Sequence, residues 1–332
     1  MVFPVLNLPA VPLGQVLKGL TSSELFEMHQ CSLKTGHTLR QFEKQNKTIK
    51  ATVDFQRSFV DVRGVRKYQV CTPEESREAL PEKSRVFDGQ EVPTGEAGEN
   101  TFNTFWPEGE KVEGAKKVTN ELIRSLGLGQ LDSVLISEEN PAQEVLEWVQ
   151  NSGVKMENFN LIGTAPEHRD ALADLVYSEE FFRKVSMNYT SLLEVSPEFS
   201  PKNFKTDTHC ITLFKLFLHH SHWFTIDHMM VFNTGAIILY HSKLSSADLN
   251  KYLTLWKEGN YTRVMYLSIH LAEGHTFDFR QITAGLIEPE KIRVEENNEV
   301  IELKRNDKIG ELTLNPAKNE LTFFVDDVPK AE

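Results

Sequence analysis

Histidine is the residue type whose spacing in this chain could support chemistry. Four histidines lie close together, and a histidine and a cysteine precede them: His219, His220, His222, His228, His209 and Cys210. Zinc is held by imidazole or thiolate ligands that converge tetrahedrally. On a strand, His220 and His222 would share one face while His219 pointed the other way, and no paired cysteine or acidic ligand stands at a standard spacing. We therefore expect surface or partly buried histidines, and predict no metal site and no cofactor. An enzyme that uses this cluster is the alternative.

The other chemically suggestive motifs are explained better as structure. Gly127-Leu128-Gly129 precedes a predicted strand, whereas a dinucleotide-binding fingerprint follows one, and its third glycine is missing. There is no P-loop and no Gly-x-Ser-x-Gly motif. Cys210 would need a histidine brought beside it in space to act as a nucleophile. Adjacent carboxylates are expected in solvated positions: Glu138-Glu139, Glu295-Glu296 and Asp326-Asp327. We predict that the chain is not an enzyme.

The composition is that of a globular protein with a net negative charge. Of 332 residues, 40% are hydrophobic and 25% are charged, and the formal net charge is −12. This charge argues against general binding to nucleic acid or anionic membranes, because both need basic patches. The three cysteines are widely spaced, which favours a reducing compartment. The apolar N-terminus lacks the basic region of a signal peptide, and no stretch is apolar enough to span a membrane. We expect a cytoplasmic or nuclear protein.

The N-terminal stretch reads as short amphipathic helices. Leu13, Val16, Leu17 and Leu20 follow the i, i+3, i+4, i+7 spacing of one helical face. The segment from Thr21 to Glu24 then has the pattern of a capping box, and Leu20 and Leu25 flank it as a hydrophobic staple. Helices this short bury too little apolar surface to be stable alone. They must pack on the downstream domain, on a partner, or on both.

This stretch resembles the F-box, the helical module that docks proteins onto the Skp adaptor of cullin ubiquitin ligases. The matching residues are Leu8-Pro9, Val16-Leu17, Leu20, Leu25 and Cys31, and residues 3–6 are typical of the nematode branch. Val11 stands where many F-boxes carry glutamate, and the aromatic residue near the end of the motif is missing. The resemblance implies an adaptor-binding surface made by Leu8, Pro9, Val16, Leu17, Leu20 and Leu25.

The rest of the chain alternates between strand and helix patterns. Residues 49–71 predict two or three strands, the charged residues 72–100 predict an exposed loop, and residues 113–126 predict a helix. Apolar β-like runs then recur about every 25–28 residues if Ile211 to Phe214 forms one of them. Capped helices lie between several runs, notably from Ser245 to Gly259, and short β runs follow after residue 292.

We therefore predict an α+β protein: a short N-terminal helical F-box, an irregular α/β stack resembling leucine-rich repeats, and a C-terminal antiparallel β meander. A conventional doubly wound sheet is the competing description. The expected domains are residues 1–45 (F-box), 46–126 (a β-rich linker region with an exposed acidic loop) and 127–328 (the α/β recognition domain).

The C-terminal half is similar to the F-box-associated type 2 domain. The segment from Leu249 to Asn260, LNKYLTLWKEGN, carries the Leu-Asn, aromatic-Leu, Trp and Gly pattern of that family, and the apolar run from Tyr266 to Ile269 follows it. Trp223 with Thr225-Ile226-Asp227 is similar to the family's upstream segment. The two resemblances together imply the substrate-recruiting subunit of a Skp–cullin–F-box ubiquitin ligase, with the Skp-type adaptor and an unknown target protein as partners. The substrate-binding residues are not identified. The alternative is a stand-alone α/β interaction module.

Overall fold

The computed structural model describes residues 10–20, 24, 27–28, 50–63, 66–76, 81–98, 100–126, 130–137, 141–162, 169–204, 211–305 and 308–327. The protein is a strand-rich mixed α/β protein that forms two compact units, Met1–Glu157 and Asn158–Glu332. The domain boundaries predicted at residues 45 and 126 stay predictions. In the described part of the chain, no helix has both the length and the apolarity needed to cross a membrane.

Helix α1 (Ala10–Lys18) is the described part of the predicted F-box helices. Leu13 and Leu17 are buried, Leu20 is half-buried, and Val16 is 40% exposed. One side of the helix is therefore covered, and Val16 faces solvent. The predicted capping box at Thr21 lies outside the described residues.

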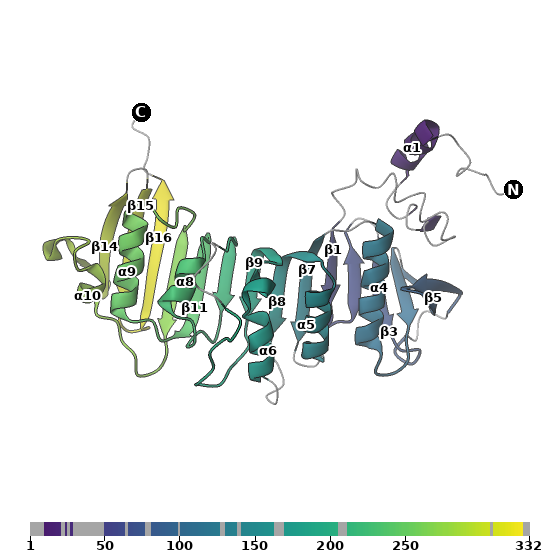
Figure 1. Ribbon diagram of the computed structural model, residues 1–332, viewed down its shortest axis with the longest axis horizontal. Coiled ribbons are helices and arrows are strands. Elements are labelled where there is room, and N and C mark those ends of the chain that lie inside the picture. Colours follow the sequence, from purple (N-terminus) through teal and green to yellow (C-terminus); the bar gives the residue numbers. More distant parts are fainter. Residues whose placement is uncertain are drawn as a thin grey trace. The chain divides into compact units, whose positions relative to one another are not determined.

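The sheet of unit 1 has the strand order β7-β1-β2-β3-β6-β5-β4. Its strands are β1 (Ala51–Asp54), β2 (Phe59–Val62), β3 (Arg66–Cys71), β4 (Lys83–Phe87), β5 (Gln90–Gly98), β6 (Thr101–Phe105) and β7 (Gln130–Ser137). The pairs β1–β7 and β3–β6 are parallel, and the other pairs are antiparallel. Helix α4 (Lys111–Leu126) packs on β2, β3 and β4, and helix α5 (Ala142–Asn151) packs on β7 (Figure 1).

The predicted exposed loop at residues 72–100 is wrong for most of its length. It contains the β4–β5 hairpin, whose turn places Asp88 at φ 47° and Gly89 at φ 81°. Two consecutive positive φ angles with an Asp-Gly sequence are typical of the tight type I′ hairpin turn. Phe87 and Val92 anchor the hairpin because both side chains are buried. The high charge of the segment obscured this short apolar alternation.

Unit 2 combines a parallel half and an antiparallel half in the strand order β8-β9-β10-β11-β12-β16-β15-β14-β13. The parallel pairs join β9 (Val185–Ser191), β10 (Lys215–Leu218), β11 (Ala236–Ser242) and β12 (Tyr266–Leu271), while β8 (Lys155–Ile162) crosses the boundary between the units. The helices between these strands are α6 (Arg169–Val176), α7 (Glu179–Phe182), α8 (Ile226–Val231) and α9 (Ser246–Lys257), and α10 (Phe279–Thr283) packs on α9.

The strand predicted at Ile211 to Phe214 is shifted in the structure. Ile211 makes only an isolated parallel bridge to Phe232, and strand β10 begins at Lys215. Leu216 and Leu218 are the residues that face the core, whereas Phe214 is 45% exposed. The strand therefore begins at Lys215, later in the chain than the sequence predicts.

The predicted C-terminal meander is confirmed. Strands β13 (Arg293–Glu295), β14 (Asn298–Arg305), β15 (Lys308–Asn315) and β16 (Glu320–Asp327) pair antiparallel in succession, and β16 also pairs with β12. This arrangement establishes neither of the two descriptions predicted from the sequence, the leucine-rich-repeat-like stack or the doubly wound sheet.

Helix α9 forms as predicted from its local signals. The Ser245 side chain accepts a hydrogen bond from the backbone N–H of Asp248, and the Asp248 carboxylate accepts from the backbone N–H of Ser245 at 2.8 Å. The predicted stripe is buried: Leu249, Tyr252, Leu253 and Trp256. Gly259 ends the helix at φ 103°, a backbone conformation that favours glycine.

Candidate protein-interaction face

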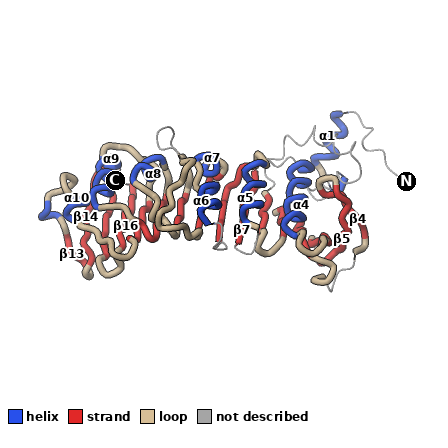
Figure 2. The backbone as a smooth tube through the Cα atoms, turned by 60° about the horizontal axis from the view of Figure 1, so that its bottom comes forward, coloured by secondary structure: helices blue, strands red, loops and turns tan. Residues whose placement is uncertain are grey.

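The parallel strands of unit 2 have one buried face and one open face. On β11 and β12, Ile237, Leu239, Leu267 and Ile269 are fully buried, whereas their neighbours Ile238, Tyr240, Tyr266 and His270 are only half-buried. Successive side chains of a strand point to opposite faces. Figure 2 shows helices α8 and α9 lying along one side of the strands of unit 2. The half-buried side chains therefore lie on the side that the helices leave uncovered.

Strand register places aromatic residues side by side on this open face. Ala236 pairs with Tyr266, and Tyr266 pairs with Phe324 of β16. Two residues after Ala236 on β11, Ile238 pairs with Phe217 of β10. We define the aromatic face as Phe217, Ile238, Tyr240, Tyr266, His270 and Phe324.

The rings of the aromatic face contact one another. Tyr240 stacks on His270 with ring centroids 4.0 Å apart and an interplanar angle of 6°. The rings of Tyr266 and Phe324 lie 4.6 Å apart, and those of Phe217 and Tyr240 lie 5.7 Å apart. Rings that hold each other in place lose little conformational freedom when a partner covers them, as binding surfaces require.

A separate set of exposed apolar side chains lies at the amino-terminal ends of the parallel strands, where Met265 precedes Tyr266 and so points away from the face that carries Phe324. Met265 is 47% exposed, Phe214 45% and Met187 43%. Backbone hydrogen bonds place these ends next to each other: Phe214 N–H donates to Met187 at 2.7 Å, and Val325 N–H donates to Met265 at 2.9 Å. Contiguous exposed apolar surface is typical of interaction sites. The arrangement can bind another protein through apolar contact.

The structure keeps two of the four histidines singled out in the sequence together and places the other two elsewhere. His222 Nε2 lies 2.7 Å from the carbonyl oxygen of Ser196, and the His228 ring accepts a hydrogen bond from the backbone N–H of Thr225 at 3.0 Å in a capping box of α8. Burial lowers the pKa of His228 to about 4, so this ring is neutral at pH 7 and can accept that bond. His219 and His220 lie together just after β10, at the carboxyl end of the parallel strands.

The predicted adaptor-binding residues fall into two groups. Leu8, Pro9 and Leu25 lie outside the described residues. Of the others, Val16 is exposed on α1, Leu20 is half-buried, and Leu17 is only 5% exposed. Among the members of the set that the structure describes, Val16 is the most accessible.

Glu27 ties the N-terminal segment to the sheet of unit 1. Its carboxylate accepts hydrogen bonds from Arg66 at 2.5 Å and from Arg85 at 2.6 Å. Both guanidinium groups also lie over the Phe102 ring, at 4.3 and 4.4 Å from its centre. These charge-assisted contacts, partly shielded from solvent, hold Glu27 against β3 and β4.

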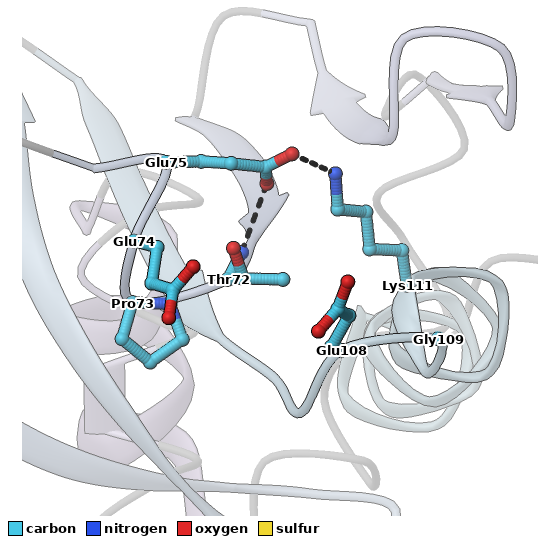
Figure 3. A pocket seen from close by; sticks show the side chains of 7 residues that line it. All are labelled: Thr72, Pro73, Glu74, Glu75, Glu108, Gly109 and Lys111. Carbon is cyan, nitrogen blue, oxygen red and sulfur yellow. Dashed lines mark hydrogen bonds and ion pairs between the residues drawn. The ribbon is translucent and has the colours of Figure 1, made fainter.

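A concave region of a different character lies in unit 1 (Figure 3). This cavity of about 550 Å³ is lined by Thr72, Pro73, Glu74, Glu75, Glu108, Gly109 and Lys111. Glu75 accepts a hydrogen bond from the backbone N–H of Thr72 at 3.0 Å and pairs with Lys111. The bond from Lys111 and that from Thr72 lower the pKa of Glu75, which stays ionised. These contacts bind a turn to the start of α4, which gives Glu75 and Lys111 a structural role.

A family comparison covers the part of the chain that carries Phe217, Ile238, Tyr240 and Tyr266 of the aromatic face. Residues 197–269 match the family model described as F-box associated, and this stretch includes β10, α8, β11, α9 and most of β12. This part of the chain is therefore similar to the F-box associated family, which confirms the resemblance seen from Leu249 to Ile269.

A nematode protein is similar to most of this chain. The Skn-1 dependent zygotic transcript 15 protein of Caenorhabditis elegans is 24% identical over 282 residues, which cover 77% of this chain and 76% of the relative. No solved structure is a significant match.

Sequence reasoning did not identify the aromatic face. The sequence did carry a signal for it: Ile237 and Leu239 alternate with Ile238 and Tyr240, so this strand is apolar on both faces. A strand that is apolar on both faces is expected to have both of them covered by protein. What the sequence could not supply was the neighbour relation between β12 and β16, which brings Phe324 beside Tyr266 from far along the chain.

Proposed function

We propose that this chain is the substrate-recruiting subunit of a Skp–cullin–F-box ubiquitin ligase. The observation that carries the proposal is the match of residues 197–269 to the F-box associated family. Domains of that name accompany F-boxes, and the N-terminal stretch has the Leu8-Pro9 and Val16-Leu17 pattern of an F-box. In this account the chain catalyses nothing itself, and works in the cytoplasm or nucleus.

In this proposal the chain binds the adaptor and the target protein through different surfaces. The N-terminal helices contact the Skp-type adaptor through apolar side chains, each of which contributes by the surface it removes from water. The aromatic face contacts the target protein, whose ubiquitination is then favoured by its high effective concentration near the ligase. Rigid aromatic side chains at an exposed position are typical of the residues that carry most of an interface's binding energy.

A stand-alone interaction module is the second candidate, and one observation favours it. Leu13 and Leu17 are buried within the chain's own structure, as they would be if α1 only covered part of unit 1. Under this reading the aromatic face still binds a partner, but no ligase is involved.

Co-purification separates the two candidates. The full chain is co-expressed with a Skp-type adaptor and purified by an affinity tag on the adaptor. The ligase proposal predicts a stable 1:1 complex that is lost when Val16 is changed to Asp. A full chain that never co-elutes with the adaptor, or one that still does so after deletion of residues 1–45, contradicts the proposal and favours the stand-alone module.

A further inference from the structure

Three imidazole rings from two different strands converge at the carboxyl end of the parallel sheet of unit 2. His219 and His220 follow β10 directly, and His241 lies near the end of β11. One ligand atom from each ring can be chosen such that all lie within 4.8 Å of one another. Sequence spacing had paired His220 with His222, but the register of β10 and β11, with Leu218 opposite Leu239, brings His241 to the cluster instead.

The separation of two of these rings fits a shared metal ion. A hydrogen bond joins Nδ1 of His219 and Nε2 of His220, which lie 3.0 Å apart. Two imidazole nitrogens bound to one tetrahedral zinc ion, each at about 2.0–2.1 Å from it, lie about 3.3 Å apart. The third ring stacks on His220, with centroids 5.0 Å apart and an interplanar angle of 6°. His241 is exposed and can therefore move the short distance that ligation requires.

The backbone around the cluster is held in an unusual conformation that aims these side chains. His241 has φ 53°, a left-handed conformation that a non-glycine residue seldom adopts, and the pairing of β11 with β12 shifts register between Leu239 and Ser242. Bulges of this kind redirect side chains and gather at functional sites. The carbonyl oxygen of Tyr240 accepts hydrogen bonds from the backbone N–H of Ser221 at 2.9 Å and from its hydroxyl at 2.8 Å. These bonds tie the His219–Ser221 segment to the end of β11.

We propose that His219, His220 and His241 bind one zinc ion. Three histidines leave one position of a tetrahedral ion for water or for a group from a bound partner. The Glu194 carboxylate acts electrostatically on His220 and would favour a cation there. Zinc at this position would lie beside Tyr240, whose ring stacks against His219 at 5.5 Å, so the ion would border the aromatic face.

Zinc titration of the untagged full chain tests this proposal. Metal is first removed with a chelator, and binding of Zn²⁺ is followed by calorimetry. Co²⁺ serves as the optical probe, because its visible absorption reports tetrahedral coordination. We expect one ion per chain. Loss of a group that only orients a ligand weakens metal binding by about 10–100-fold, so His241→Ala should weaken it by at least about tenfold.

Matched variants make the result decisive. His275 is an exposed histidine outside the cluster, and His275→Ala should leave zinc affinity unchanged. His241→Ala replaces an exposed side chain, and circular dichroism with a thermal melt of the metal-free protein verifies that it folds like wild type. The proposal is overturned if wild type shows no saturable 1:1 binding, or if His219→Ala, His220→Ala and His241→Ala all retain wild-type affinity.

Discussion

Trp256 of α9 and Phe323 of β16 meet edge to face, with ring centroids 4.9 Å apart and an interplanar angle of 89°. Both rings are fully buried, and the contact joins the helix recognised in the sequence to the meander that follows it. Arg305 adds a cation over the Trp256 ring at 4.9 Å and donates to the Trp256 carbonyl oxygen at 3.2 Å. This packing joins residues 197–269, which match the F-box associated family, and the C-terminal strands in one core.

Gly310 of β15 makes room for that contact. A Cβ atom at this position would lie 2.3 Å from Cε2 of Phe323 and 3.1 Å from the Trp256 ring. Gly310→Ala should therefore destabilise the fold by about 1–3 kcal/mol, the usual cost of overpacking a core. Urea unfolding measures it, with Glu311→Ala, an exposed neighbour on the same strand, as the control. Equal stability of both variants would show that the core relaxes without cost.

The Ser245 cap should contribute measurably to the stability of α9. Its hydroxyl accepts from the Asp248 backbone N–H, and removing such a cap costs about 1 kcal/mol. Ser245→Ala is expected to lose that amount in chemical denaturation, and Ser245→Asn, which can cap equally well, should lose far less. If the two substitutions have the same effect, the cap is not the source of the stability.

Target binding should depend on Phe324 while folding does not. Phe324 is 51% exposed, and surface substitutions usually change stability by no more than about 0.5 kcal/mol. We expect Phe324→Lys to melt like wild type yet to retain fewer proteins in affinity capture performed with the ligase blocked.

The control for that capture is Val294→Lys on β13. Val294 is 73% exposed and lies outside the aromatic face, so its substitution introduces the same charge without touching the proposed site. Quantitative mass spectrometry compares the captured proteins. An equal loss in both variants would mean that added charge, and not the aromatic face, governs binding.

Stability should fall as the pH falls from about 6.5 to about 4. Burial lowers the pKa of His228 from 6.5 to about 4, so the unfolded chain binds more protons than the folded chain within this interval. The stabilisation is complete above pH 6.5 and is lost toward pH 4. Urea unfolding at pH 7 and pH 5 measures the slope.

His228→Gln isolates the contribution of His228. Glutamine at this position of the capping box can still accept from the backbone N–H of Thr225, but it does not titrate. The variant should therefore show a smaller loss of stability between pH 7 and pH 5, whatever its absolute stability. An unchanged difference would exclude His228 as a source of the pH dependence.

Local signals in the sequence predicted local structure well. The cap at Ser245, the buried stripe that ends at Trp256 and the stop at Gly259 each depend on residues within one helix, and all three are confirmed. The Asp88-Gly89 turn carried a signal of the same kind, but the surrounding charges outweighed it and the β4–β5 hairpin was missed.

Features that depend on strand neighbours could not be predicted in the same way. His241 reaches His220 only because β10 and β11 are parallel and in a particular register, and Phe324 reaches Tyr266 only because β16 returns beside β12. The burial of Leu17 next to an exposed Val16 likewise depends on which side of α1 is covered. Periodicity identifies an apolar helical face but not what covers it.

The affinity of the full chain for a purified Skp-type adaptor, measured by calorimetry for wild type, Val16→Asp and Val294→Asp, tests the central proposal most directly. Burying a valine side chain contributes about 1.5–3 kcal/mol, so Val16→Asp should weaken binding by at least about tenfold. Both valines are exposed in the free chain, so neither substitution introduces a charge into the core. The account predicts saturable 1:1 binding for wild type and Val294→Asp and its loss in Val16→Asp. Absence of binding by wild type, or equal binding by all three proteins, would contradict it.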